Sequence, residues 1–204
     1  MARACRTVAV TLTAAITAGG RSSRFESDKA LAVFEGRTLL RRVAASLEFC
    51  PHKVLIAPVG KYTLEGWQVI SDLYPGCGPL SGLEAALEHA QTEWIAYAAV
   101  DMPLLTRAVW TVLERQKTSE SQALVPLDAG GRPQPLAALY SRSSLKTVKK
   151  WLQGDDFKMV NFLEALETRF VSWEILLEAG VQEEVFLNVN TRADLERLTW
   201  SGKS

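Results

Sequence analysis

The chain has 204 residues, 48% of them hydrophobic, with 23 Lys and Arg residues against 23 Asp and Glu residues. This length and apolar content suffice for one buried core, so we expect a single domain over residues 1–204 with its core at about residues 7–200. The balanced charge offers no global attraction for nucleic acid or an anionic membrane, so any anion site must be local.

Two further features of the sequence indicate in which cellular compartment the protein is found. No apolar stretch is long enough to span a bilayer. The three cysteines are odd in number and lack metal-ligand spacing, which favours free thiols over a disulfide framework; they are Cys5, Cys50 and Cys77. We therefore expect a cytoplasmic protein.

The first predicted element is an apolar run over residues 8–16. Arg3 and Arg6 in front of it crudely resemble the start of a signal peptide. The β-branched residues of the run fit a buried strand better. We therefore expect a strand that leads directly into the loop that follows.

This loop has the composition of a phosphate-binding loop. Gly19 and Gly20 permit close backbone approaches that a β-carbon would forbid, so several N–H groups can turn toward one anion. Three cations lie within nine residues, Arg21, Arg24 and Lys29, and their guanidinium and ammonium groups suit phosphate oxygens. The loop has neither the Gly-x-Gly-x-x-Gly nor the P-loop pattern. The local alternative is a Gly-Gly turn followed by a solvated basic segment.

Downstream, apolar runs alternate with stretches of helical spacing. A helix is expected over residues 39–48 with Thr38 as its N-cap, followed by strands at 53–59 and 67–70. Further strands are expected at 93–100, 123–126, 136–140, 169–173 and 184–187, with helices at 106–116, 144–153, 159–167 and from Thr191, capped with Asp194. This alternation predicts an α/β fold with a mainly parallel sheet wound with helices.

A rigid connection over residues 72–84 leads into a helix that runs to about Ala90. Ser81 and Glu84 form a capping-box pattern. A capped turn would explain these two residues, but not two prolines and three glycines in one connection. We expect them to place the helix N-terminus beside a ligand at the carboxyl edge of the sheet.

Asp101 ends the buried apolar strand at 93–100 and is followed by Met102 and Pro103. In an open α/β sheet, ligands and metals bind at such strand ends. An isolated Asp at a strand end is often only a turn former. Facing a triphosphate, however, its carboxylate would hold Mg²⁺, which takes one or two carboxylates together with phosphate oxygens and water. Asp101 and Lys29 therefore make chemical sense together.

Several of these segments together resemble one known family, the molybdenum cofactor guanylyltransferases. The similar segments are Ala18–Phe25, Asp28–Ala30, Gly78–Leu83, Asp101–Pro103, Arg132–Leu136, Asn161–Leu163 and Asn188–Thr191. They extend over nearly the whole chain. The Gly-Gly loop alone would fit many nucleotidyltransferases. The Gly-Pro-Leu-Ser-Gly and Asn-Val-Asn-Thr segments narrow the resemblance to the molybdenum cofactor guanylyltransferases.

The resemblance implies a Rossmann-like three-layer α/β/α fold of the nucleotide-diphospho-sugar transferase type. It implies transfer of GMP from Mg-GTP to the terminal phosphate of molybdopterin, which gives molybdopterin guanine dinucleotide and pyrophosphate. GTP and molybdopterin would be the substrates and Mg²⁺ the cofactor. Transient contacts with molybdenum-insertion proteins or molybdoenzyme chaperones would follow, without nucleic acid or membrane as partners.

The resemblance also implies roles for individual residues. Lys29, Asp101 and Arg24 would be catalytic, and Asp101 would hold the metal. The nucleotide would contact Thr17, Ala18, Gly19, Gly20, Arg21, Lys29, Asp72, Gly78 and Asp101. The acceptor would lie near Arg132, Gln134, Asn188 and Asn190.

The chain departs from the family pattern at three positions. Thr17 stands where Leu is usual, Glu26 replaces a usual glycine, and Ala57 occupies the position of an Asn that often contacts the nucleotide. Two alternatives therefore stay open. One is a related nucleotidyltransferase that uses CTP or a sugar-phosphate acceptor, and the other is a noncatalytic nucleotide- or cofactor-binding module.

Overall fold

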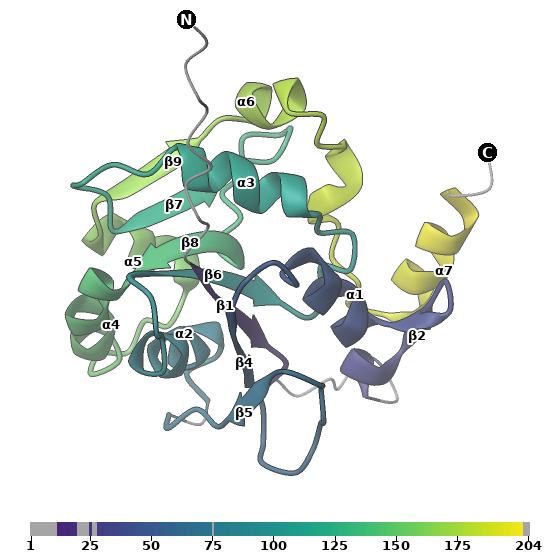
Figure 1. The fold of residues 1–204 in the computed structure, drawn as a ribbon, viewed down its shortest axis with the longest axis horizontal. Helices are drawn as coiled ribbons and strands as arrows, with labels where there is room; N and C mark the ends of the chain where they lie inside the picture. Colours follow the sequence, from purple (N-terminus) through teal and green to yellow (C-terminus); the bar gives the residue numbers. More distant parts are fainter. Residues whose placement is uncertain (1–11, 20–24, 26–27, 75, 202–204) are drawn as a thin grey trace, which may run out of the picture.

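A computed structural model describes residues 12–19, 25, 28–74 and 76–201. Its main feature is a seven-stranded sheet with the strand order β5-β4-β1-β6-β8-β7-β9 (Figure 1). The strands are β1 Leu12–Thr17, β4 His52–Ile56, β5 Gln68–Ile70, β6 Trp94–Ala99, β7 Ala123–Pro126, β8 Ala137–Ser141 and β9 Thr168–Val171. Only β8 runs against its neighbours, so the sheet is mainly parallel, as predicted.

Strand β1 lies in the interior of the sheet between β4 and β6, and all six of its residues are buried. Its side chains alternate between two cores. Leu12, Ala14 and Ile16 belong to one hydrophobic cluster, and Ala15 belongs to the other. Burial on both faces explains why the sequence of this strand is apolar throughout instead of alternating with polar residues.

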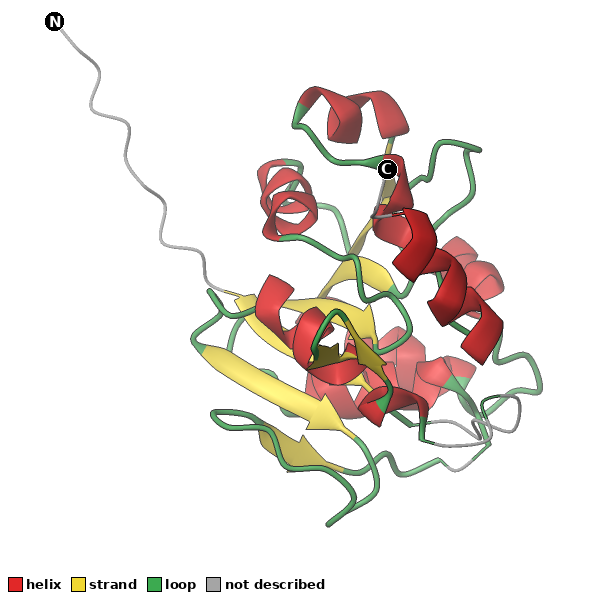
Figure 2. Ribbon diagram, turned by 90° about the vertical axis from the view of Figure 1, so that its right-hand side faces the viewer, coloured by secondary structure: helices red, strands yellow, loops and turns green. Residues whose placement is uncertain are grey.

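Helices cover both faces of the sheet (Figures 1 and 2). One core contains side chains of α1 Leu39–Ser46, α3 Arg107–Arg115 and α6 Trp173–Glu178. The other contains side chains of α2 Pro79–Glu88, α4 Leu145–Trp151 and α5 Met159–Phe162. The predicted three-layer α/β/α architecture is confirmed. Among the described residues, no helix has the length and hydropathy needed to cross a membrane.

A two-stranded hairpin stands beside the main sheet. It consists of β2 Val33–Phe34 and β3 Arg37–Thr38, and Thr38 then caps α1 by accepting a hydrogen bond from the backbone N of Arg41. The last helix, α7 Arg192–Ser201, lies next to this hairpin (Figure 1). A small third core joins them: Leu195 and Leu198 of α7 pack against a buried cluster that includes Phe34 of the hairpin. The C-terminal segment is thereby held near the segment that follows the Gly-Gly loop.

Two local predictions were wrong, and a third differs from the structure in its bounds. Ser81 and Glu84 do not form a capping box, because α2 already begins at Pro79 and Gly78 precedes it. Ser81 Oγ instead accepts a hydrogen bond from the backbone N of Tyr74, and Glu84 is buried near Lys149. The expected strand at 184–187 is a 3-10 helix, η4 Glu183–Phe186, and the strand expected at 169–173 ends at Val171 because Trp173 starts α6.

Four loops meet at one edge of the sheet. Thr17 is in register with Ile56 of β4 and with Ala99 of β6, so these three parallel strands end at the same level. Because β8 is antiparallel, the connection from β7 to β8 also reaches this edge, where Ala137 is in register with Ala98. The carboxyl ends of parallel strands are where open α/β sheets bind ligands.

Candidate active site

A cavity of about 130 Å³ lies at this edge of the sheet. Its walls come from the loops that follow β1 and β6, from the 3-10 helix η1 Lys29–Leu31, from the start of α2 and from the residue before β8. The lining residues are Thr17, Ala18, Gly19, Asp28, Lys29, Ala30, Pro79, Ala99, Val100, Asp101 and Leu136. Segments far apart in the sequence thus converge on one concave surface, in which Asp28, Lys29 and Asp101 lie among mostly small apolar residues.

Lys29 is the cation at the centre of this surface. Its Nζ lies 3.1 Å from Asp101 Oδ2 and 3.3 Å from Asn190 Oδ1. The side chains of Lys29 and Asp101 are 17% and 20% exposed, so the pair is largely shielded but still accessible from the cavity. Because an ammonium group has three donors and no acceptor, Lys29 can keep one of these contacts while it binds an anionic ligand.

Asn190 is placed by two backbone contacts. The N–H of the preceding Val189 donates to the carbonyl oxygen of Asp101 at 2.8 Å, which ties the C-terminal segment to the end of β6. The N–H of Asn190 itself donates to Asp194 Oδ2 at 3.0 Å. Asp194 and Thr191 exchange further side chain to backbone hydrogen bonds, so the capping pattern predicted there is confirmed.

Asp28 holds the backbone of the Lys29 segment in place. Its carboxylate accepts hydrogen bonds from the Ala30 N–H at 3.1 Å and from the Tyr62 hydroxyl at 2.7 and 2.8 Å, and it pairs with Lys61 Nζ at 2.9 Å. Burial alone would raise the pKa of Asp28. The hydrogen bonds from Lys61, Tyr62 and Ala30 outweigh this effect and hold its pKa below the ordinary value of 3.8.

Asp101 offers one oxygen to a ligand. Its Oδ1 is buried and has no hydrogen-bond partner among the described residues, whereas its Oδ2 faces Lys29. A buried carboxylate oxygen without a partner is costly unless a ligand satisfies it. No group of three or more His, Cys, Asp or Glu side chains that could hold a metal is found in the described part of the chain. The Asp101 carboxylate oxygen that is unpaired among the described residues is the kind of protein ligand that Mg²⁺ takes when substrate oxygens and water complete its shell.

The N-terminus of α2 forms another wall of the cavity. Gly78 has φ 61° and ψ −148°, a conformation that only glycine adopts readily, and it turns the chain into the helix. Pro79 then occupies the first helical position and lines the cavity. The first backbone N–H groups of a helix have no partner within the helix, so this end can donate to an anion.

The loop between β7 and β8 is organised by Asp128. Its carboxylate accepts hydrogen bonds from the backbone N–H groups of Gly130 and Arg132, from Arg132 Nε at 2.9 Å and from Gln134 Nε2 at 3.0 Å. Burial would raise the pKa of Asp128, but the contacts with Arg132 and Gly130 lower it overall. The Arg132 side chain stays 81% exposed, so most of its donors face solvent.

The predicted site residues fall into three groups. Five of them line the cavity: Thr17, Ala18, Gly19, Lys29 and Asp101. Asp72 and Gly78 lie in the connection before α2, Arg132 and Gln134 lie in the β7–β8 loop, and Asn188 is exposed near Asn190, the residue that contacts Lys29. Gly20, Arg21, Arg24 and Glu26 lie outside the described residues. The roles assigned to all these residues stay predictions.

Sequence reasoning missed three contributors to the site. Asp28 was read only as part of a motif, although an Asp before a short helical turn is a recognisable N-cap signal. Tyr62 and Tyr97 reach the site from other elements, as partners of Asp28 and of the Pro79 carbonyl. No local pattern identifies such long-range partners.

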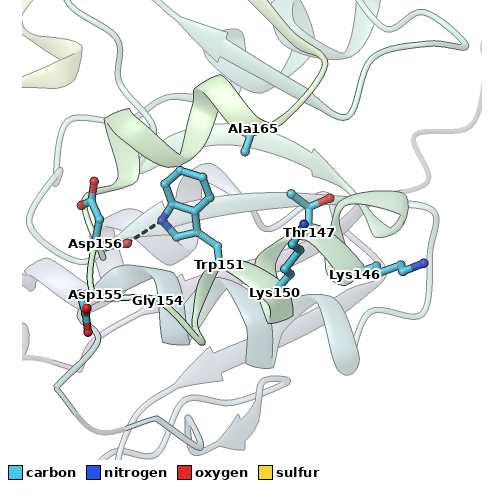
Figure 3. Close-up of a pocket in the computed structure, with 8 residues that line it drawn as sticks. All are labelled: Lys146, Thr147, Lys150, Trp151, Gly154, Asp155, Asp156 and Ala165. Atoms are coloured by element: carbon cyan, nitrogen blue, oxygen red, sulfur yellow. Dashed lines mark hydrogen bonds between the residues drawn. The ribbon is translucent and has the colours of Figure 1, made fainter.

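A second cavity, of about 620 Å³, lies along α4 and the segment that leads to α5 (Figure 3). It is lined by Lys146, Thr147, Lys150, Trp151, Gly154, Asp155, Asp156 and Ala165. The Trp151 indole N–H donates to the Asp156 carbonyl oxygen at 2.5 Å. None of the loops that follow β1 or β6 contributes to this cavity, so we assign the site to the smaller one, where polar groups converge.

The chain is similar to known proteins of one family. Residues 14–169 match the family model described as a MobA-like NTP transferase domain. A curated relative from Deinococcus radiodurans, named "Probable molybdenum cofactor guanylyltransferase", is 46% identical over 195 residues, which cover 94% of this chain and 96% of the relative. A relative of the same name from Carboxydothermus hydrogenoformans is 33% identical over 188 residues, covering 92% and 94%.

The similarity to solved structures agrees with the similarity in sequence. The crystal structure of molybdopterin-guanine dinucleotide biosynthesis protein A from Archaeoglobus fulgidus superimposes with a TM-score of 0.79 at 25% identity, covering 94% of this chain and 98% of that chain. The match to the family model and the near-complete coverage of the curated relatives lead to one conclusion. This chain belongs to the MobA-like NTP transferase family.

Proposed function

We propose that this protein transfers GMP from GTP to the terminal phosphate of molybdopterin, which forms molybdopterin guanine dinucleotide and releases pyrophosphate. One observation carries the proposal. Lys29, Asp101 and Asn190 come from three distant segments and meet at the carboxyl edge of the sheet, in a chain whose relatives are named molybdenum cofactor guanylyltransferases. A cation beside a strand-end carboxylate is suited to a magnesium-bound triphosphate.

In the proposed reaction, a terminal phosphate oxygen of molybdopterin attacks the α-phosphorus of GTP. A new P–O bond forms there while the bond between the α-phosphorus and its bridging oxygen to the β-phosphate breaks, and pyrophosphate leaves with that oxygen. No covalent enzyme intermediate is needed. The rate enhancement would then come from alignment and from neutralisation of the developing negative charge.

Lys29 would supply most of that neutralisation within the described site. Its ammonium group faces the cavity and is already oriented by Asp101 Oδ2 and Asn190 Oδ1. Asp28 fixes the turn that carries Lys29 by capping it through the Ala30 N–H. A cation held in place before the substrate binds needs little reorganisation in the transition state.

Asp101 would hold Mg²⁺ through Oδ1, the buried oxygen without a partner among the described atoms. The ion would supply positive charge to the triphosphate and the pyrophosphate leaving group. In this proposal, the two carboxylate oxygens of Asp101 have different roles. Its Oδ2 orients Lys29, and its Oδ1 is available to the metal.

The acceptor would approach from the β7–β8 loop. Arg132 and Gln134 are both fixed by the Asp128 carboxylate, and the guanidinium group of Arg132 remains largely exposed. Such a group is well suited to a phosphate. Leu136, at the end of this loop, lines the same cavity as Lys29, which supports the proposal that the two substrates bind on adjoining surfaces.

The reaction is proposed to take place in the cytoplasm. Cys50 and Cys77 are free thiols in the structure, as expected for a reducing compartment. Burial raises the pKa of Cys50 to about 12, so this thiol stays protonated and unreactive at neutral pH. Transient contacts with molybdenum-insertion proteins or molybdoenzyme chaperones remain part of the proposal.

The test is a transfer assay with molybdopterin and each of GTP, CTP, ATP and UTP, with Mg²⁺ and with excess chelator. The proposal expects a dinucleotide product and pyrophosphate in equal amounts, only with Mg²⁺ and with GTP strongly preferred. A preference for CTP would identify a cytidylyltransferase instead. Nucleotide binding without any product would identify a noncatalytic binding module.

A further inference from the structure

Two tyrosines are fully buried in the core between the sheet and α2. Tyr97 lies on β6 and Tyr140 lies on the neighbouring antiparallel strand β8. Their ring centroids are 6.1 Å apart with an interplanar angle of 78°, an edge-to-face arrangement. Phenylalanine would pack equally well at both positions, because ring stacking does not require the hydroxyl groups. The hydroxyl groups therefore need an explanation of their own.

Each hydroxyl group donates to the carbonyl oxygen of a proline at the edge of the candidate site. Tyr97 donates to the Pro79 carbonyl oxygen at 2.7 Å, and Tyr140 donates to the Pro135 carbonyl oxygen at 2.8 Å. Pro79 is the first residue of α2 and lines the cavity. Pro135 belongs to the β7–β8 loop, immediately before Leu136, which also lines the cavity.

The contact of Tyr97 is part of a tight approach of α2 to the sheet. The hydroxyl group of Thr17, the last residue of β1, hydrogen-bonds to the Tyr97 phenol. A β-carbon on Gly82 would lie 2.7 Å from the Tyr97 hydroxyl oxygen and 3.0 Å from Thr17 Oγ1. A larger residue at position 82 would force the Tyr97 hydroxyl to shift, so glycine fits this close approach although alanine is the better helix former. The hydroxyl pair and the glycine together set the distance between α2 and the strand ends.

Both hydroxyl groups are permanent donors. Burial raises the pKa of Tyr97, opposed in part by the hydrogen bond from Thr17, and burial likewise raises the pKa of Tyr140. Neither phenol ionises near neutral pH. A buried hydroxyl group without its acceptor would be costly, so each tyrosine constrains the backbone of the loop it contacts.

We propose that Tyr97 and Tyr140 are positioning residues, one for each substrate. Tyr97 holds the N-terminal turn of α2 against the nucleotide, and Tyr140 holds the β7–β8 loop against the phosphate-bearing acceptor. The inference rests on the proposed function. Neither tyrosine touches a substrate, because each acts through a proline carbonyl oxygen.

The two phenylalanine variants test the inference, and each is the matched control for the other. Both changes remove one buried oxygen and keep the edge-to-face ring pair. We expect Tyr97→Phe to raise the KM for GTP roughly fivefold, the effect of one lost buried hydrogen bond. We expect Tyr140→Phe to raise the KM for molybdopterin to a similar extent. Each variant should leave the other KM and kcat nearly unchanged, since a contact that acts equally on ground and transition state changes KM alone.

Gly82→Ala tests the role of the Tyr97 hydroxyl group in a second, independent way. The new methyl group would displace the Tyr97 hydroxyl from its place, so this variant should also weaken GTP binding without changing the KM for molybdopterin. Calorimetric titration with GTP in the presence of Mg²⁺ measures this effect without turnover. Thermal unfolding of all three variants separates a local effect from general destabilisation.

A crossed pattern, with Tyr97→Phe acting on GTP and Tyr140→Phe on molybdopterin, supports the inference. It is overturned if both variants change both KM values equally, or if neither KM changes. A wild-type protein that binds GTP but makes no dinucleotide would contradict the proposed function instead. In that case, unchanged GTP affinity in Tyr97→Phe and Gly82→Ala would overturn the Tyr97 part, and weakened affinity would support it.

Discussion

Two of the cavities among the described residues, the α4–α5 cavity and the strand-edge cavity, differ in a way that shows how a site is built. The α4–α5 cavity is the larger, at about 620 Å³, but all its lining residues lie within one stretch, residues 146–165. The strand-edge cavity measures about 130 Å³, and its lining residues extend from Thr17 to Leu136. Only the second is formed by the fold as a whole. Convergence of charged groups from distant segments, and not volume, marks the catalytic candidate.

Replacement of Asp101 should show most clearly which of the two cavities is the active site. Asp101→Ala removes both the orphaned oxygen and the partner of Lys29, and we expect GMP transfer to fall by at least about 10³-fold. Asp156→Ala is the control in the larger cavity, because Asp156 also accepts local hydrogen bonds. It should leave transfer within about twofold, since it lies outside the machinery described above.

The variant Asp101→Asn distinguishes a catalytic role of the Asp101 carboxylate from a structural one. Asparagine has the same shape as aspartate, so the variant should unfold at the wild-type temperature while losing most of its transfer activity. Unfolding of this variant would assign Asp101 a structural role. Retained transfer in Asp101→Ala would show that the strand-edge cavity is not the active site.

Lys29→Ala should have the next largest effect. Loss of the cation that we propose faces the α-phosphate should lower kcat about 10²-fold. The unfolding free energy should fall by only about 1–3 kcal/mol, the cost of leaving Asp101 Oδ2 without its partner in a largely shielded pair. Lys53→Ala is the matched control: Lys53 pairs with Glu48 at 2.8 Å and its side chain is 14% exposed, close to the 17% of Lys29. Equal activity losses in the two variants, measured in the transfer assay, would remove Lys29 from the mechanism.

Asp128→Ala tests the acceptor side of the strand-edge site. The change removes the group that accepts from Gly130, Arg132 and Gln134, so the loop loses its internal support. We expect the KM for molybdopterin to rise about tenfold, in line with the loss of charged hydrogen bonds, and GTP affinity to stay unchanged. A rise in the dissociation constant for GTP, measured by calorimetry, would argue against a separate acceptor surface.

The smallest expected effect concerns pH. The pKa of Asp28 is lowered in the folded protein, so its stabilisation is fully present above its unfolded value of about 3.8 and is lost as the pH falls through the folded pKa. Wild type should therefore exceed Asp28→Asn in unfolding free energy at pH 7 by on the order of 1 kcal/mol, and the difference should shrink below about pH 4. Denaturant unfolding of both proteins at several pH values measures this. If the difference in unfolding free energy between wild type and Asp28→Asn did not change with pH, the lowered pKa of Asp28 in the folded protein would be contradicted.

Much of the fold follows from local patterns. The apolar strands, their Gly and Pro stops and the helical spacing of residues 39–48 are all visible in the sequence and are confirmed in β1, β4, β6 and α1. The capping box at Ser81 and Glu84 failed because tertiary packing overrides a local pattern: Glu84 is buried under α4 near Lys149. Likewise, residues 184–187 have strand composition, but the structure has the 3-10 helix η4 Glu183–Phe186 in their place.

The site was only partly predictable. Lys29 and Asp101 could be paired from chemistry and from the family resemblance, and the structure places their side chains 3.1 Å apart. The Tyr62 hydroxyl contacts Asp28 across 34 residues of sequence, and Tyr97 contacts Pro79 across 18. Such partners have no signature in a single sequence, because they depend on how the loops are placed by the completed sheet.

The most direct test of the central claim is a crystal structure of the protein with Mg²⁺ and a non-hydrolysable GTP analogue. We expect the triphosphate at the strand-edge cavity, with Lys29 Nζ near the α-phosphate and the metal on Asp101 Oδ1. Nucleotide bound in the α4–α5 cavity, or at the strand ends without contact to Lys29 and Asp101, would contradict the account.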